Sequence, residues 1–187
     1  MTNEMQNTRD IVQELLRRIA GRDHDGVAGM FAEQIDWRLS WPAEGHSEVP
    51  WIRPRSTRAE VAEHFRALDA HHVPELNGTS VARILVDGAD AVVLGEIVQT
   101  VRGGGAAYTS PFALHLTVED GFITRYHIFE DSLTVARALS AASPLTGSRR
   151  SRLVSAHGHG VQERVQAAAG LPAAERAGVV PITTHRR

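Results

Sequence analysis

The sequence predicts an α+β fold, a cone-shaped α+β barrel in which a curved antiparallel sheet wraps around a long helix. Helical periodicity and one short strand pattern occupy the first 72 residues. Four segments with strand composition then follow closely: about 79–87, 90–102, 107–118 and 122–130. Glycine-rich turns separate the later segments: Asp87-Gly88, Gly103-Gly104-Gly105 and Asp120-Gly121. Such turns favour antiparallel hairpins.

The first part of the chain predicts three helices and one strand. An apolar face on the first helix carries Ile11, Val12, Leu15, Leu16 and Ile19. The segment "DHDGVAGMFAEQ" at 23–34 predicts a short second helix, and "IDWRLSW" at 35–41 alternates as a strand does. A loop at 42–54 follows, which is typical of a lid or functional edge.

Capping residues mark the remaining two helices. Thr57 and Glu60 fit a capping box at the start of a helix over 57–72. Asp131 or Ser132 caps a closing helix over 132–140. The predicted order is therefore α-α-β-α-β-β-β-β-α, with antiparallel meander pairing.

The length of 187 residues predicts one domain with an appendage. We expect the domain at 1–143. The Ala/Gly/Arg-rich tail at 144–187 has no aromatic residue, and it carries seven arginines and two glutamates. This composition predicts disorder. The alternative is a basic arm that touches nucleic acid or the acidic body.

The overall composition excludes several function classes. A net charge of −2 does not suggest a nucleic-acid or membrane-surface partner. The absence of cysteine removes disulfides, thiolate metal sites and cysteine nucleophiles, and the absence of lysine removes Schiff-base chemistry. No apolar run approaches the roughly 18 residues of a membrane helix. We therefore expect a cytoplasmic protein with no membrane partner.

Two motifs carry a resemblance to a known superfamily. They are "PFALHLTVEDGFITRYHIFED" at 111–131 and "TRAEVAEHFRAL" at 57–68. Together with the element order over 7–140, they resemble the nuclear transport factor 2-like (NTF2-like, cystatin-like) superfamily, in its SnoaL-like branch. The resemblance implies a deep apolar cone, a small hydrophobic ligand and a homodimer formed through the sheet. It also implies cofactor-free acid/base isomerisation or cyclisation of a polyketide- or steroid-like carbonyl compound.

At several positions this sequence differs from the residues that the resemblance implies. The carboxylate that relatives often place on the last strand falls on Ile128, and the isomerase base on the first strand falls near Trp41. Glu96 is the only acid in the middle-strand region where epoxide hydrolases use Arg-x-Asp. Their Tyr and Asn positions fall near Arg38 and Ser40. Epoxide hydrolysis is therefore a minor alternative.

Three residues are the catalytic candidates. Strand alternation places Glu96 on one face with Leu94 and Val98, which we expect to be the concave face; the alternative is a solvent-facing or dimer-facing carboxylate. His64 lies on the apolar face of the long helix, as a proton shuttle paired with a carboxylate or as a satisfied core histidine. Tyr126 offers a phenol to an oxyanion, or simply packs.

The remaining candidates concern binding. Six residues are expected to line the substrate pocket: Trp37, Trp41, Trp51, Phe65, Leu114 and Ile128. His115 and His127 on neighbouring strands lack a clear third ligand, so no metal site and no cofactor are predicted. Arg53 and Arg55 in "WIRPRS" bind an anionic group in one interpretation and belong to a solvated loop in the other.

These residues leave three functional hypotheses open. The first is a SnoaL-like isomerase or cyclase that uses Glu96, His64 and Tyr126. The second is a non-catalytic module that holds a hydrophobic ligand in the same cone, which Ile128 favours. The third is an interaction protein that uses the outer sheet face and the basic tail.

Overall fold

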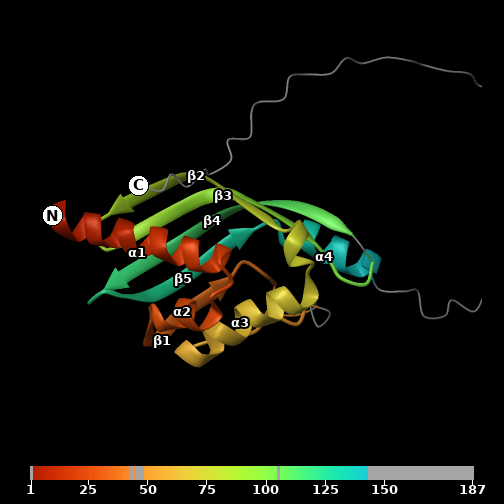
Figure 1. The fold of residues 1–187 in the computed structure, drawn as a ribbon, viewed down its shortest axis with the longest axis horizontal. Helices are drawn as coiled ribbons and strands as arrows, with labels where there is room; N and C mark the ends of the chain where they lie inside the picture. The colour runs from red at the N-terminus through yellow and green to blue at the C-terminus, as the bar shows by residue number, and fades with distance from the viewer. Residues whose placement is uncertain (1, 43, 45–48, 105, 143–187) are drawn as a thin grey trace, which may run out of the picture. The chain divides into compact units, whose positions relative to one another are not determined.

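The computed structural model describes residues 2–42, 44, 49–104 and 106–142, so the predicted tail at 144–187 lies outside the described residues. The elements are α1 (Thr2–Ala20), α2 (His24–Gly29), β1 (Phe31–Leu39), α3 (Arg58–His71), η1 (Pro74–Leu76), β2 (Gly78–Asp87), β3 (Asp90–Thr100), β4 (Ala107–Glu119), β5 (Phe122–Glu130) and α4 (Ser132–Ala142). Figure 1 shows a curved sheet with α1, α2 and α3 on one side. The predicted α+β class and cone-shaped fold are confirmed.

The five strands form one sheet in the order β1-β5-β4-β3-β2. Strands β2 to β5 are antiparallel neighbours, as predicted, but β1 runs parallel to β5. The expectation of antiparallel pairing throughout was therefore wrong for β1. A parallel pair needs a long crossover connection, and α3 with three intervening strands supplies it.

Strand β1 begins four residues earlier than predicted. The helix expected over 23–34 ends at Gly29, and Phe31 already pairs with Ile123 of β5. The Phe31 side chain is fully buried, and the Ile123 N–H donates to the Met30 carbonyl at 2.9 Å. Long-range strand pairing therefore replaced the helical hydrogen bonds that the local sequence favoured.

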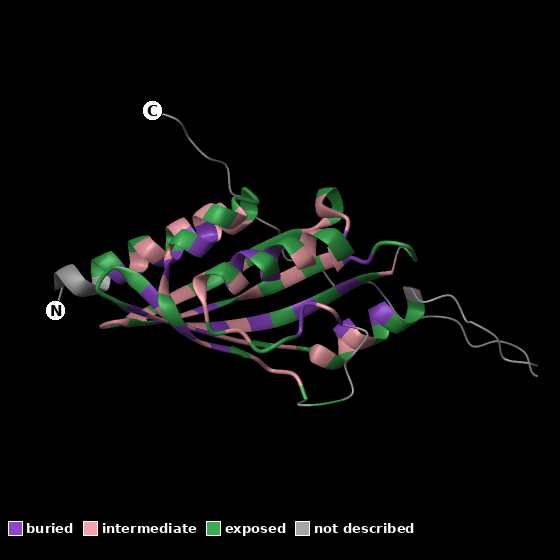
Figure 2. Ribbon diagram, turned by 90° about the horizontal axis from the view of Figure 1, so that it is seen from below, coloured by how far each residue is buried: buried purple, intermediate pink, exposed green. Residues whose placement is uncertain are grey.

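The inner face of the sheet packs against α1 and α3. Val12 and Leu15 of α1 and Val61 of α3 are fully buried in the same core cluster as Val93 and Leu116 of the sheet. Figure 2 shows the resulting alternation of buried and exposed residues along the strands. Since adjacent strand residues face opposite sides, this core defines which residues of each strand point inward.

A second buried cluster fills the end of the sheet near α4. Trp51 and Ile52 of the loop before α3 pack there with Tyr108 of β4 and Val135 and Leu139 of α4. Asp131 begins α4, because its Oδ1 accepts the Thr134 N–H at 3.0 Å. The loop and the last helix are thus attached to the same end of the inner face.

Gly95 allows close packing between β3 and its neighbours. A Cβ atom at this position would lie 2.1 Å from the Ser80 carbonyl oxygen and 2.8 Å from the Phe112 ring. The pairing of β2 with β3 also shifts register beside this point, between Val81 and Arg83. Only glycine fits between the adjoining strand and the aromatic ring without displacing one of them.

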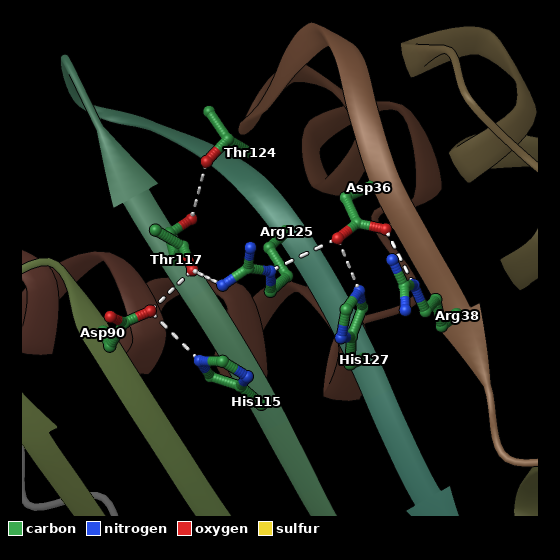
Figure 3. A network of polar contacts seen from close by, with 8 residues as sticks. All are labelled: Asp36, Arg38, Asp90, His115, Thr117, Thr124, Arg125 and His127. Carbon is green, nitrogen blue, oxygen red and sulfur yellow. Dashed lines mark hydrogen bonds and ion pairs between the residues drawn. The ribbon is translucent and has the colours of Figure 1, made fainter.

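The outer face of the sheet carries a polar network at one end (Figure 3). Asp36 of β1 contacts His127 at 2.9 Å, Arg38 at 3.1 Å and Arg125 at 3.3 Å. The His127 contact is the main cause that lowers the pKa of Asp36 to about 2. The network therefore joins β1 to β5 by charge as well as by backbone hydrogen bonds.

A neighbouring set of contacts extends this network to β3 and β4. Asp90 accepts hydrogen bonds from Thr117 at 2.6 Å and pairs with His115 at 3.0 Å. Arg125 also donates to the Thr117 hydroxyl at 3.2 Å. These contacts cross four adjacent strands on the solvent side.

We predict that Gly95→Ala lowers the free energy of unfolding by about 1–3 kcal/mol, because the added methyl group overpacks the β2–β3–β4 contact. Denaturant titration of both proteins measures the change. Gly29→Ala is the matched control, since a Cβ there meets nothing within 4 Å. Equal stability of Gly95→Ala and the wild type would contradict the packing argument.

We predict that the Asp36 contacts stabilise the fold mainly above mildly acidic pH. The folded-state pKa of Asp36, about 2, lies below its ordinary value of 3.8. The contribution is therefore complete above about pH 4 and disappears as the pH falls through about 2. Asp36→Asn and His127→Ala should each flatten the fall in unfolding free energy across this window. An unchanged acid profile in both variants would refute the prediction.

Candidate functional site

A carboxyl group lies on the inner face at the end of β5. Glu130 shares this face with Tyr126 and Ile128, because every second residue of a strand points to the same side. Its side chain is partly buried, and its Oε1 accepts the Trp41 indole N–H at 2.8 Å. The Glu130 backbone N–H donates to the Ser40 hydroxyl at 2.9 Å. Both contacts come from the residues just after β1, which fix the position of the carboxyl group.

Burial raises the pKa of Glu130 above its usual range, against the opposing effect of the Trp41 hydrogen bond. The nearby charge of Asp131 raises the pKa further. A carboxyl group with a raised pKa exchanges a proton closer to neutral pH, which is what general acid/base chemistry requires. Glu130 is therefore the candidate acid/base group of the inner face.

Two buried tyrosines lie within the electrostatic reach of Glu130. Burial raises the pKa of both Tyr108 and Tyr126, and the Glu130 charge raises each of these pKa values further. Both phenols therefore stay protonated near neutral pH and act as hydrogen-bond donors. The two donors differ in what they contact.

Tyr108 belongs to a closed buried network. His72 Nδ1 donates to the Leu68 carbonyl at 2.8 Å, and its Nε2 lies 3.0 Å from the Tyr108 hydroxyl. Burial lowers the pKa of His72, so the ring is neutral and Nε2 accepts the phenol proton. The same hydroxyl donates to Gln99 Oε1, which gives the phenol proton a second acceptor within the protein. The Tyr108 hydroxyl proton therefore already has hydrogen-bond acceptors within the protein.

The Tyr126 hydroxyl has no hydrogen bond to any residue within the described ranges. The Tyr126 ring stacks on Trp37 with 4.1 Å between ring centroids and an interplanar angle of 8°. Trp37 in turn meets the His64 ring edge-on at 4.9 Å. The indole N–H of Trp37 is buried and has no acceptor in the described part of the chain. The stack therefore presents two donors without protein partners.

His64 lies at the far side of this stack as a neutral ring. It is 4 % exposed, and its Nδ1 donates to the Trp51 carbonyl at 3.3 Å. Burial, and then the positive charge of Arg55, lower the pKa of His64 to about 3. Of the two interpretations of His64, pairing with a carboxylate is not found among the described residues. A ring with this pKa does not carry a proton near neutral pH.

The structure places Glu96 on the outer face, so the expectation that it faces inward was wrong. Glu96 does share a face with Leu94 and Val98, as predicted, but all three are exposed. The core side chains of β3 are Ala91 and Val93, which have the opposite parity. The apolar neighbours Leu94 and Val98 made the outer face resemble an inner one.

The predicted lining residues divide between the two buried clusters. Trp37, Phe65 and Leu114 are buried in the core cluster, and Ile128 is partly buried against it. Trp51 is buried in the second cluster, and Trp41 packs against that cluster. The structure thus brings Tyr126, Trp37 and His64 together, with Trp41 reaching the same region through Glu130.

Glu130 was not among the residues predicted from the sequence. The strand at 122–130 was predicted, but the resemblance implied an acid at the position of Ile128. Glu130 lies two residues farther along, so it has the same strand parity as Tyr126 and Ile128. Counting that alternation to the end of the strand would have identified it.

The described ranges were also compared with the requirements of a metal site and of a membrane-crossing helix. No group of three or more His, Asp or Glu residues there is arranged to hold a metal ion. His115 and His127, the pair considered for a metal, contact Asp90 and Asp36 separately. No helix among these residues has the length and apolarity needed to cross a membrane.

Comparison with known proteins identifies similar folds. The model of the SnoaL-like domain matches residues 12–126. None of the curated proteins compared with the chain matches it. An NTF2-like protein of unknown function from Burkholderia pseudomallei is 22% identical, with a TM-score of 0.63 over 72% of this chain and 98% of its own.

Two further solved structures contain small molecules. A Catenulispora acidiphila protein with a ketosteroid isomerase-like fold, in complex with trimethylamine, is 13% identical; its TM-score is 0.57 over 70% of this chain and 92% of its own. TerC co-crystallised with polyporic acid is 17% identical; its TM-score is 0.60 over 72% of this chain and 98% of its own. At these identities the likeness concerns the fold.

Proposed function

Because the chain belongs to the SnoaL-like domain family, we propose that it is a cofactor-free acid/base enzyme that isomerises or cyclises a small hydrophobic carbonyl compound. The observation that carries the proposal is the Glu130 carboxyl group, held on the inner face by Trp41 with its pKa raised by burial. Polyketide-like and steroid-like carbonyl compounds are the substrates to test first. The small molecules bound by TerC and by the Catenulispora protein support a ligand site in this fold.

The proposed reaction moves one proton. As a carboxylate, Glu130 removes a proton from the carbon next to the substrate carbonyl, and the electron pair of that C–H bond moves to the carbonyl oxygen. The Tyr126 hydroxyl donates a hydrogen bond to the resulting enolate oxygen. Glu130, now protonated, returns the proton to another carbon of the same substrate. Glu130 and Tyr126 thus perform the roles that the sequence analysis had given to Glu96, His64 and Tyr126.

A second candidate function is ligand binding without turnover. The apolar residues around the Trp37–Tyr126 stack and the apolar Ile128 at the family's usual acid position favour it. Binding would use the same inner face, so the two functions differ only in whether Glu130 transfers a proton. Replacement of that one carboxyl group separates them.

We predict that Glu130→Gln lowers turnover of a responsive substrate by about 10²–10⁴-fold while ligand affinity changes little, because general acid/base groups contribute on this scale. A panel of β,γ-unsaturated ketones, followed by absorbance of the conjugated product, identifies the substrate. Glu96→Gln is the matched control, an exposed glutamate on a neighbouring part of the sheet. Loss of turnover in Glu96→Gln with retention in Glu130→Gln would contradict the assignment. Binding of the ketones by a wild type that converts none would favour the second function.

We also propose that two copies of the chain associate through the outer face of the sheet. Leu94, Val98 and Phe129 are 36%, 37% and 55% exposed on that face, and Ala113 lies between Leu94 and Phe129 in the strand register. A contiguous exposed apolar surface of this kind favours association with another protein surface. The polar network around Asp36 adjoins it and carries both signs of charge, which suits contact with a second copy.

We predict that Phe129→Ser shifts the protein from dimer to monomer. A two-fold interface buries Phe129 of both copies, and burial of each Phe side chain contributes about 1.5–3 kcal/mol. Size-exclusion chromatography with light scattering should give twice the 20.4 kDa chain mass for the wild type. Leu133→Ser is the matched control, since Leu133 is 57% exposed on α4 and not on the sheet. A monomeric wild type would refute the interface.

A further inference from the structure

Arg55 is a partly buried cation without a protein counter-charge. No carboxylate lies within 4 Å of its guanidinium group among residues 2–42, 44, 49–104 and 106–142, and its Nε–H is buried with no acceptor there. The only hydrogen bond from its side chain in this set is a long one, from an Nη–H to the Trp51 carbonyl at 3.5 Å. Burial lowers the pKa of Arg55, which reflects the cost of holding this charge away from water.

The carboxylates nearest to Arg55 are occupied or exposed. Glu60 Oε2 accepts the backbone N–H groups of Ser56 and Thr57 at 2.8 and 2.9 Å and the Thr57 hydroxyl at 2.8 Å. Glu63 is exposed on α3. Both influence the pKa of Arg55 only through space. The protein therefore supplies no anion in contact with this guanidinium among its described residues.

Arg55 lies beside the ring stack of the candidate site. Arg55 and the His64 ring both donate to the same Trp51 carbonyl, and the Arg55 charge contributes to the low pKa of His64. His64 also contacts Trp37, whose buried indole N–H lacks an acceptor. Two buried donors without partners therefore border one neutral histidine ring.

Arg53 provides an internal comparison. It stands two residues earlier in the same loop, but it is exposed and its Nε–H already donates to the Pro50 carbonyl at 2.8 Å. The two arginines that the sequence presented as equivalent therefore differ. Arg53 is exposed and its Nε–H has an acceptor, whereas Arg55 is partly buried and its Nε–H has no acceptor among the described residues.

We propose that Arg55 is an anion-binding residue of the substrate site, so that the ligand is a hydrophobic carbonyl compound carrying an acidic group such as a carboxylate. The inference rests on the proposed function and specifies its substrate class. A planar guanidinium binds a carboxylate with two parallel hydrogen bonds, and the Trp37 N–H is a further donor in the same region. The buried donors that the protein leaves without acceptors would then be satisfied by the ligand.

The charges also determine how such a ligand is oriented. The charges that shift the pKa of Arg55 come from Glu60, Glu63 and Arg53, whereas Asp131 is the charge that shifts the pKa of Glu130. Arg55 lies in the loop before α3, whereas Glu130 is the last residue of β5. An acidic ligand is attracted to the first and repelled by the second when Glu130 is ionised. This difference in charge favours an orientation in which the acid of the ligand contacts Arg55 and not Glu130.

The test compares two probes of nearly the same shape, the anion 2-naphthoate and the neutral amide 2-naphthamide, by calorimetric titration of the full chain near neutral pH. The wild type should bind the naphthoate at least about tenfold more tightly, the usual scale of a charge-assisted contact. Arg55→Gln should remove that preference and leave naphthamide affinity unchanged. The matched control Arg53→Gln should retain the preference.

The outcomes separate this inference from the proposed function. Equal affinity of the wild type for the two probes would overturn the anion subsite while leaving a hydrophobic ligand site in place. Binding of neither probe would overturn both for this class of compound. Retention of the naphthoate preference in Arg55→Gln would also overturn the subsite.

A stability measurement covers the case in which Arg55 is needed for folding. An unpartnered desolvated charge destabilises the protein, so Arg55→Met should have an unfolding temperature equal to or above that of the wild type. A marked fall would assign Arg55 a structural role and overturn the proposal.

Discussion

The parallel pairing of β1 with β5 holds both the interior site and the outer polar network in place. It sets Trp37 opposite Tyr126, which produces the stacked rings of the inner face. It continues past the end of β1, where the Ser40 N–H donates to the Ile128 carbonyl at 3.0 Å and Trp41 reaches Glu130. On the other face it brings Asp36 to His127 and Arg125. Loss of this one pairing would separate the groups on both sides of the sheet.

Desolvation then determines the chemical state of each group on the inner face. Burial disfavours the charged form of every titratable side chain, so the pKa of Glu130 rises while the pKa of His64 falls to about 3. The same effect keeps the phenol of Tyr126 protonated. The inner face therefore presents a protonatable carboxyl group, a neutral imidazole and a phenol donor. That set suits proton transfer within a bound ligand better than transfer through a histidine.

The two faces of the sheet differ in character, and we propose ligand binding for the inner face and association for the outer face. Glu130 and Glu96 are both strand glutamates near apolar residues, yet one is held inside and the other lies on the solvent side. The difference comes from register, because a shift of one residue moves a side chain to the opposite face. The strand positions that face inward carry apolar side chains and a few polar groups in fixed positions, as ligand sites do. The strand positions that face outward carry exposed apolar residues and a charged network, as interfaces do.

The sequence by itself determined the fold class, the element order and most element boundaries of residues 7–140, because periodicity, caps and glycine turns are local signals. It also selected Trp37 and Tyr126, which the structure stacks on the inner face of the sheet. Only the tertiary structure decided the direction of β1 and the face on which Glu96 lies. It likewise decided that Glu130 and not Glu96 is the carboxyl group on the inner face, and that Arg55 is partly buried whereas Arg53 is exposed. These properties depend on strand register and on burial by distant segments, and neither is encoded in the residues adjacent to the group.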